Sequence, residues 1–226
     1  MVDLIVAPMP PSIKSYGYGF AVPTASLSVP HSAGDLMVGF AWGINMGDGT
    51  LGSPLITLGI SSGYSTLALL NNVTTQPMLI GYKRASGGSV DNWNPSYACT
   101  GDDTQYAMGG LLVISDARTI TTSSAYYTGS GSVTLPPYGT NSNLLIQAVF
   151  DLAYGLFSGG GTASPIINAP SSVFPVGSFY VPQAYTPKVV GNEFFYKYTG
   201  ATGSTTYTGN GGAVPDNMYS IQVQIS

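Results

Sequence analysis

The sequence predicts an all-β protein, folded as an antiparallel β-sandwich with a jelly-roll-like arrangement. Charged residues make up only 7% of the 226 residues, and Glu193 is the sole glutamate, so the chain lacks the side chains that usually cover solvated helices. Glycine, proline and tyrosine are abundant, with 30, 16 and 16 copies. Short runs of β-forming residues recur along the chain, each bounded by Gly, Pro, Asn or Asp. Many short strands in regular succession are typical of sandwiches and jelly rolls.

The expected strands follow one another through the whole chain. They span residues 26–29, 35–42, 53–60, 77–85, 109–115, 131–136, 143–150, 178–185, 193–199 and 219–226. Only Ser65 to Val73, with the sequence STLALLNNV, has a pattern that a short helix could also adopt.

Two stretches of the chain resemble each other and predict an internal repeat. SLSVPHSAGDLMVGF and SVTLPPYGTNSNLLIQA both read as a β run ending in proline, a polar turn and a strongly apolar strand. Four pairs of landmarks keep the same order, 106, 108, 114 and 111 residues apart: Ser26 and Ser132, Leu36 and Leu144, Tyr82 and Tyr196, Ser115 and Ser226. The alternative is that strands and turns look alike in any all-β chain.

The domain organisation follows from the repeat and from the lack of a linker between its halves. We expect residues 15–226 to form a single sandwich domain, with pseudo-repeat halves of about 15–120 and 121–226. Residues 1–14 are apolar and proline-rich, and they predict either an extended arm or the first edge strand.

The charge pattern bears on possible partners. The net charge is −4, and the six basic residues are scattered, so we expect no nucleic-acid partner. A surface with so few charges offers little repulsion between molecules, which favours a homo-oligomer or a larger assembly. The N-terminal sequence MVDLIVAPMPPSI has an acid at position three and only a short apolar run, so we expect neither a signal peptide nor a membrane span.

The single histidine, His31, lies close to Ser32 and Asp35, which raises the question of a hydrolytic triad. Triad residues usually come from distant segments, and no second histidine or G-x-S-x-G elbow is present. Pro, Gly and Asp in PHSAGD are typical turn residues, and the second half has PPYGTN at this place. We therefore interpret His31 as a replaceable turn residue and predict no catalytic residue.

Metal and cofactor sites are not expected. One histidine and one cysteine, Cys99, exclude the usual zinc spacings, and Asp48 and the Asp102–Asp103 pair fit Gly-Asp turns better than a calcium loop. A glycosidase would need two carboxylates at one place. A β fold can bring together acids that are distant in the sequence, and those available are Asp91, Asp116, Asp151 and Glu193.

Aromatic residues among Gly and Ser are the candidate contact residues. Tyrosine and tryptophan rings with a polar edge suit protein interfaces and the faces of sugars, although they can equally cover the edges of their own sandwich. The Gly- and Thr-rich segment from Thr199 to Gly212 predicts a long contact loop. The candidates for interface or glycan contact are Tyr16, Tyr18, Trp93, Tyr126, Tyr127, Tyr198 and Tyr207.

Nearly the whole chain, from about Ser12 to Ser226, resembles a β-sandwich module of bacteriophage and prophage virion proteins. The similar segments are GDLMVGF, YKRASG, SVTLP, NSNLLIQAVF and GATGSTTYT. Proteins of this kind belong to tail fibres, minor tail proteins or head-associated proteins. The resemblance implies a structural or adhesive role, and it supplies no catalytic, metal-binding or cofactor-binding residue.

The resemblance leads to a non-enzymatic virion protein made in the host cytoplasm, with other virion proteins, such as major capsid or tail proteins, as partners. The chain lacks a heptad run or repetitive shaft, so a capsid decoration or cement protein is the leading hypothesis. The alternative is a tail-associated receptor-binding or adhesion module that recognises host surface glycans. A cellular carbohydrate-binding β domain is a third hypothesis.

Overall fold

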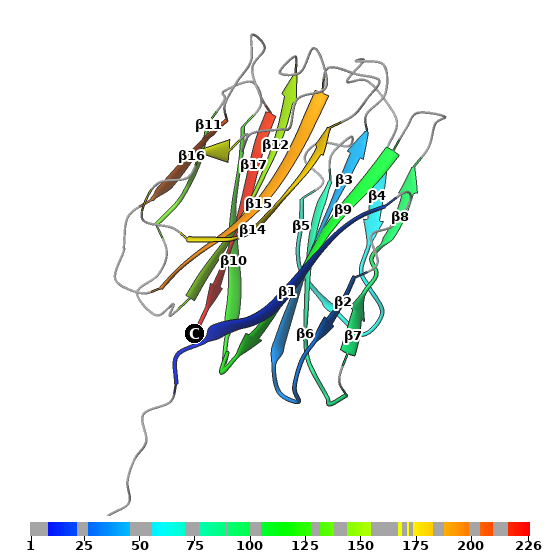
Figure 1. The fold of residues 1–226 in the computed structure, drawn as a ribbon, viewed down its shortest axis with the longest axis vertical. Helices are drawn as coiled ribbons and strands as arrows, with labels where there is room; N and C mark the ends of the chain where they lie inside the picture. The colour runs from blue at the N-terminus through cyan, green and yellow to red at the C-terminus, as the bar shows by residue number, and fades with distance from the viewer. Residues whose placement is uncertain are drawn as a thin grey trace, which may run out of the picture.

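The computed structural model describes most of the chain and shows an antiparallel all-β protein (Figure 1). Every helix or strand element that it describes is a β-strand. The described residues are 9–21, 27–45, 56–70, 77–88, 90–99, 105–127, 132–137, 144–154, 167–168, 171, 174–182, 188–198, 204–209 and 217–226.

Two five-stranded sheets form the centre of the molecule. The first large sheet has the strand order β1 (Ser12–Ala21), β9 (Gln105–Ser115), β3 (Leu36–Asn45), β6 (Met78–Arg84) and β5 (Ser65–Leu70). The second large sheet has the order β10 (Ile120–Tyr127), β17 (Asn217–Ile225), β12 (Leu144–Tyr154), β15 (Lys188–Tyr198) and β14 (Phe174–Pro182).

Shorter strands form a further layer beside each large sheet. The first outer layer consists of β2 (Leu27–Pro30) paired with β7 (Val90–Trp93), and β4 (Ile56–Gly59) paired with β8 (Ser96–Cys99). The second outer layer has the order β11 (Ser132–Leu135), β16 (Thr205–Gly209) and β13 (Ile167–Asn168). The four layers follow one another across the molecule in Figure 1, with the outer layers on opposite sides.

The two large sheets have the same strand order, and their central strands have the same register. In chain order, β1 of the first half corresponds to β10 of the second, β3 to β12, β5 to β14, β6 to β15 and β9 to β17. Replacing each strand of the first sheet by its counterpart gives the strand order of the second sheet. In β3, Leu36 lies opposite Ile114 of β9 and Arg84 of β6. In β12, Leu144 lies opposite Ile225 of β17 and Tyr198 of β15. The spacings of 108, 111 and 114 residues between these positions are those of the landmarks in the sequence. The chain is thus built from two equivalent β units, an arrangement compatible with the predicted jelly-roll topology.

The main core lies between the two large sheets. Strands β3, β6 and β9 contribute residues such as Val38 and Phe40, and strands β12 and β17 contribute residues such as Ile146 and Val223. A second core lies between the first large sheet and its outer layer, and it includes Met37, Leu79, Trp93 and Leu111. Strand β3 is therefore covered on both faces, which explains its continuous apolar run LMVGFAW.

Some local expectations differ from the structure. The short helix that Ser65 to Val73 could adopt is not formed over Ser65–Leu70, which is the edge strand β5 and pairs with β6; residues 71–73 lie outside the described part. The boundary placed after residue 14 falls inside β1, an edge strand that begins at Ser12. Residues 1–8 of the expected arm lie outside the described residues.

Candidate functional site

The turn around His31 has the structure that its residue types predict. The Asp35 backbone N–H donates to the carbonyl of Ser32 at 3.2 Å, and the Asp35 carboxylate accepts from the Ser32 N–H at 2.7 Å. Gly34 has a φ of 86°, in the left-handed region that glycine adopts easily. Asp35 is also bound to Lys14, with 2.9 Å between Nζ and Oδ2. Ser32 and Asp35 therefore engage Lys14 and the turn.

The His31 ring points to a different carboxylate. Its side chain is only 1% exposed, and Nε2 lies 3.9 Å from Oδ2 of Asp91. Neither ring nitrogen makes a hydrogen bond to another described residue. The turn at His31 is confirmed and the ring is packed in its surroundings, while the replacement of His31 without loss of folding stays a prediction.

Asp91 belongs to a partly buried cluster beside the second core. Lys83 forms an ion pair with Asp91, and its ammonium lies 4.7 Å from the centre of the Tyr64 ring. Burial by itself would raise the pKa of Asp91. The hydrogen bonds from Lys83 and the Asn92 backbone, together with the nearby positive charge, outweigh burial and hold this pKa below its ordinary value. Burial, followed by the charge of Asp91, raises the pKa of Tyr64. The cluster keeps its charges in fixed places and packs Tyr64 against Trp93, with ring centres 4.9 Å apart.

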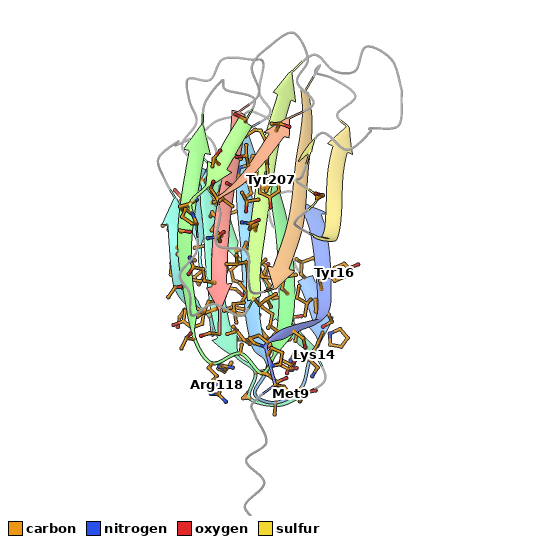
Figure 2. The ribbon with its side chains drawn as sticks, turned by 90° about the vertical axis from the view of Figure 1, so that its left-hand side faces the viewer. Met9, Lys14, Tyr16, Arg118 and Tyr207 are labelled. Carbon is orange, nitrogen blue, oxygen red and sulfur yellow. The ribbon has the colours of Figure 1, made fainter. Side chains whose placement is uncertain are left out.

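A polar pocket of about 610 Å³ lies at one end of the molecule. Four segments line it: Met9 and Lys14 near the start of β1, the turn 32–35, Arg84 at the end of β6, and residues 115–118, which begin with the last residue of β9. Strand register places these segments together, because Leu36 lies opposite both Arg84 and Ile114, and Ser12 lies opposite Ser115. Figure 2 shows Met9, Lys14 and Arg118 close together at the lower end of the sheets.

The pocket holds charges that are not balanced by ion pairs. Arg84 donates to the carbonyls of Gly34 and Arg118, at 3.2 and 3.1 Å. Within the described part of the chain, Lys14 is paired with Asp35, whereas Arg84, Arg118 and Asp116 have no ion-pair partner. Three basic and two acidic side chains give the pocket a formal charge of +1, on a chain whose net charge is −4. The pocket is therefore suited to a small ligand with negative charge.

The exposed residues that the structure describes on the strands of the two outer layers carry no charge. Along each strand, residues such as Leu27 and Val133 point into the molecule, and their neighbours Ser28 and Thr134 point outward. Thr134 and Thr206 are hydrogen-bonded to each other on the second face, with 2.9 Å between their hydroxyl oxygens. The exposed residues described on β2, β4, β7, β8 and β16 are Ser28, Pro30, Thr57, Asn92, Ser96, Ala98, Thr206 and Thr208.

The expected aromatic contact residues differ in exposure, and some of their side chains are not described. Tyr16 is 51% exposed on β1 (Figure 2). Tyr18, Tyr126, Tyr127 and Tyr198 belong to strands β1, β10 and β15, and their side chains lie outside the described part. Their neighbourhoods were interpreted as loops, because strands rich in Gly, Ser and Tyr resemble loops in composition. Most of the predicted contact segment from Thr199 to Gly212 is also undescribed, and its described residues from Thr205 to Gly209 form strand β16.

Trp93 and Tyr207 are buried, so placing them on an exposed contact surface was wrong. Both are 0% exposed. They occupy corresponding positions of the repeat, with Trp93 opposite Leu27 and Tyr207 opposite Val133. Each ring fills the space between an outer layer and a large sheet, where burial of a large aromatic surface contributes most to stability.

The space beneath these two rings is filled differently in the two halves. Trp93 lies over Gly39 and Gly81, where an added Cβ would clash with its ring, and it donates to the Phe40 carbonyl at 2.9 Å. In the second half, Gln147 occupies the place of Gly39. The Tyr207 hydroxyl donates to Gln147, and Gln147 donates to Gln222 at 2.7 Å. A larger ring over two glycines thus corresponds to a smaller ring over a buried amide network.

Of the other acidic residues, the described side chains of Asp91 and Asp116 lie at different places. The backbone register brings Asp151 of β12 and Glu193 of β15 near each other, since Glu193 lies opposite Val149 and Asp151 lies opposite Gly191. Within the described residues, no three His, Cys, Asp or Glu side chains come close enough to hold a metal ion. Asp91 is bound to Lys83, and Asp116 lies in the pocket. The side chains of Asp151 and Glu193, and all of Asp48, Asp102 and Asp103, lie outside the described part. No helix in that part is long and apolar enough to cross a membrane.

The pocket was not predicted, because its basic residues are scattered in the sequence. Lys14, Arg84 and Arg118 come together only through the pairing of β1, β9, β3 and β6. A positional signal exists only for Arg84 and Arg118, which lie near the ends of the expected strands 77–85 and 109–115, whereas Lys14 lies in β1, which was not among the expected strands. In comparisons with known proteins, no family model, curated protein or solved structure matches this chain.

Proposed function

We propose that the chain is a non-enzymatic structural protein of a bacteriophage particle, an accessory coat protein that contacts neighbouring subunits through its two outer layers. The observation that carries the proposal is the duplication of the β unit. It gives the molecule an outer layer of short strands on each of two opposite sides of one continuous body (Figure 1). A body with a contact face on each side can bridge two neighbours in a shell.

The character of these faces supports the proposal. Their exposed described residues are mainly Ser, Thr and Asn, and they carry no charge. Two such faces can approach other subunits without the repulsion that like charges would produce. Many modest interfaces, repeated over a particle, stabilise it without any single strong site. The resemblance of the sequence to virion β-sandwich modules points to the same role.

The test combines localisation with charged variants of each face. We expect electron microscopy of particles from the encoding phage to place the protein at regular sites over the head. Ser28→Glu on the first face and Thr206→Glu on the second should each weaken co-sedimentation with particles by about tenfold, because an unpaired charge is desolvated at the contact. Thr121→Glu is the matched control, since Thr121 is exposed on β10 and belongs to neither outer layer.

Two outcomes would overturn the coat hypothesis. One is localisation only at the tail, and the other is equal binding by all three variants. Tail localisation would favour the second candidate function, adhesion to host glycans. The polar pocket favours that candidate, because Arg84 and Arg118 bring positive charge without ion-pair partners in the described chain.

A further inference from the structure

The polar pocket concentrates the positive charge of the described chain. The basic side chains that the structure describes are Lys14, Lys83, Arg84 and Arg118, and all except Lys83 line this pocket. Lys14 is neutralised by Asp35, so the two guanidinium groups supply the excess charge. A ligand that matches them carries an anionic group, and a planar carboxylate fits the donor geometry of a guanidinium.

Arg84 is held in place before any ligand arrives. Its two terminal nitrogens donate to the carbonyls of Gly34 and Arg118, which belong to two different walls of the pocket. A guanidinium has five N–H donors, so three remain for a ligand. Because the side chain is already ordered, little conformational entropy is lost when a ligand binds.

Asp116 gives the pocket a second kind of recognition. Its backbone has a φ of 57°, in the left-handed region, where Asp and Asn are the side chains best tolerated after glycine. Asp116 is exposed and is one of the lining residues, together with Ser32 and Ser115. A carboxylate accepts hydrogen bonds from hydroxyl groups but repels a simple anion. Guanidinium donors beside a carboxylate acceptor therefore suit a ligand that carries both an acid and hydroxyl groups.

We propose that this pocket binds an acidic saccharide, a sugar unit bearing a carboxylate. The acid group binds at Arg84 and Arg118, and sugar hydroxyls donate to Asp116. A volume of about 610 Å³ can hold a sugar unit, and the polar lining suits a polyhydroxylated ligand better than an apolar one. The inference rests on the pocket alone and does not require the proposed location in a virion, so each can fail without the other.

The test is an NMR titration of the full-length, ¹⁵N-labelled chain with D-glucuronate, neutral D-glucose and inorganic phosphate. We expect D-glucuronate to shift the amide signals of Gly34, Ala117 and Arg118 in a saturable way. Glucose and phosphate should each bind about tenfold more weakly, because each lacks one of the two recognised groups. The proposal is overturned by no saturable shift at about 50 mM glucuronate, by equal binding of glucose, or by shifts that map outside the pocket.

Variants separate specific recognition from general attraction of anions. Arg118→Gln should weaken glucuronate binding about tenfold, whereas Lys188→Gln, which removes the same charge from β15 in the other half, should leave it unchanged. Asp116→Asn retains a residue that tolerates the left-handed backbone. It should strengthen phosphate binding and remove most of the preference for glucuronate. If phosphate already binds the unmodified chain as well as glucuronate does, the pocket is a general anion site and the proposal is wrong.

Discussion

At the residue scale, His31, Lys83 and Asp91 form a compact cluster in which the two opposite charges of Lys83 and Asp91 are paired. Asp91 accepts from Lys83 and from the Asn92 backbone, and His31 packs nearby with almost no exposed surface. Such a pair contributes to stability while both partners are charged, because each compensates for the partial desolvation of the other.

Asp91→Asn should lower the free energy of unfolding at pH 7 by roughly 1–3 kcal/mol, because Lys83 loses its charged partner. The folded state holds the pKa of Asp91 below its ordinary value of 3.8. The contribution of ionised Asp91 to the free energy of unfolding is therefore fully present above pH 3.8, and it is lost as the pH falls through the lower pKa of the folded state. Urea unfolding from pH 7 to pH 3 should show the difference between wild type and variant shrinking below about pH 4.

Asp116→Asn is the matched control, since Asp116 has no ion-pair partner in the described part of the chain. Its unfolding free energy should stay within about 0.5 kcal/mol of the wild type at pH 7. A constant difference between Asp91→Asn and the wild type over the whole pH range would contradict the assignment.

At the element scale, the contact between an outer layer and its large sheet depends on the residues beneath one ring. Trp93 approaches the backbone at Gly39 and Gly81 so closely that a Cβ at Gly81 would lie 2.8 Å from Cζ3 of the ring. These glycines are needed for space and not for an unusual backbone conformation. In the second half the same space holds Tyr207, Gln147 and Gln222, all buried.

Gly39→Ala should therefore destabilise the protein by roughly 1–3 kcal/mol, because the new methyl group collides with the Trp93 ring. The Trp93→Leu protein should itself be destabilised by about 3 kcal/mol. In that background, Gly39→Ala should lower the free energy of unfolding by much less than it does in the wild type. Urea unfolding of the four proteins gives the coupling energy. Additive effects of the two substitutions would show that the ring does not set the requirement for glycine.

The sequence predicts the buried strands of this fold better than it predicts which aromatic side chains are buried or where the pocket forms. The strands around Leu36 and Leu144 were predicted because both faces of β3 and β12 are buried and their apolar runs are continuous. Strand β1 was missed because its sequence SIKSYGYGFA mixes exposed polar residues with glycine, as a loop does. The burial of Trp93 and Tyr207 depends on long-range pairing, and so does the pocket, so local patterns do not contain either feature.

At the scale of the whole molecule, the two repeats share their largest core. Residues of both large sheets form one buried cluster, so neither sheet can cover its inner face without the other. We expect the chain to unfold as one cooperative unit, although its strand order contains two equivalent halves.

Val38→Asp should abolish folding of both halves, because Val38 is 0% exposed in the shared core and an unpaired buried carboxylate costs several kcal/mol. Hydrogen exchange should show loss of protection in β3 and also in β12 and β17. Thr66→Asp is the control, since Thr66 is exposed on the edge strand β5, and it should fold normally. Retained protection in β12 and β17 of Val38→Asp would show that the halves are independent domains.

The unequal filling beneath Trp93 and Tyr207 also determines how a duplicated chain assembles correctly. Two units with the same strand order and register could in principle exchange their outer layers, within one molecule or between two. If the first outer layer covered the second large sheet, Trp93 would meet Gln147 where it now meets Gly39. If the second layer covered the first sheet, the Tyr207 hydroxyl would lose Gln147 and the glycines would leave a void. The difference in side-chain size therefore favours packing of each outer layer on its own large sheet and disfavours assemblies in which the layers are swapped.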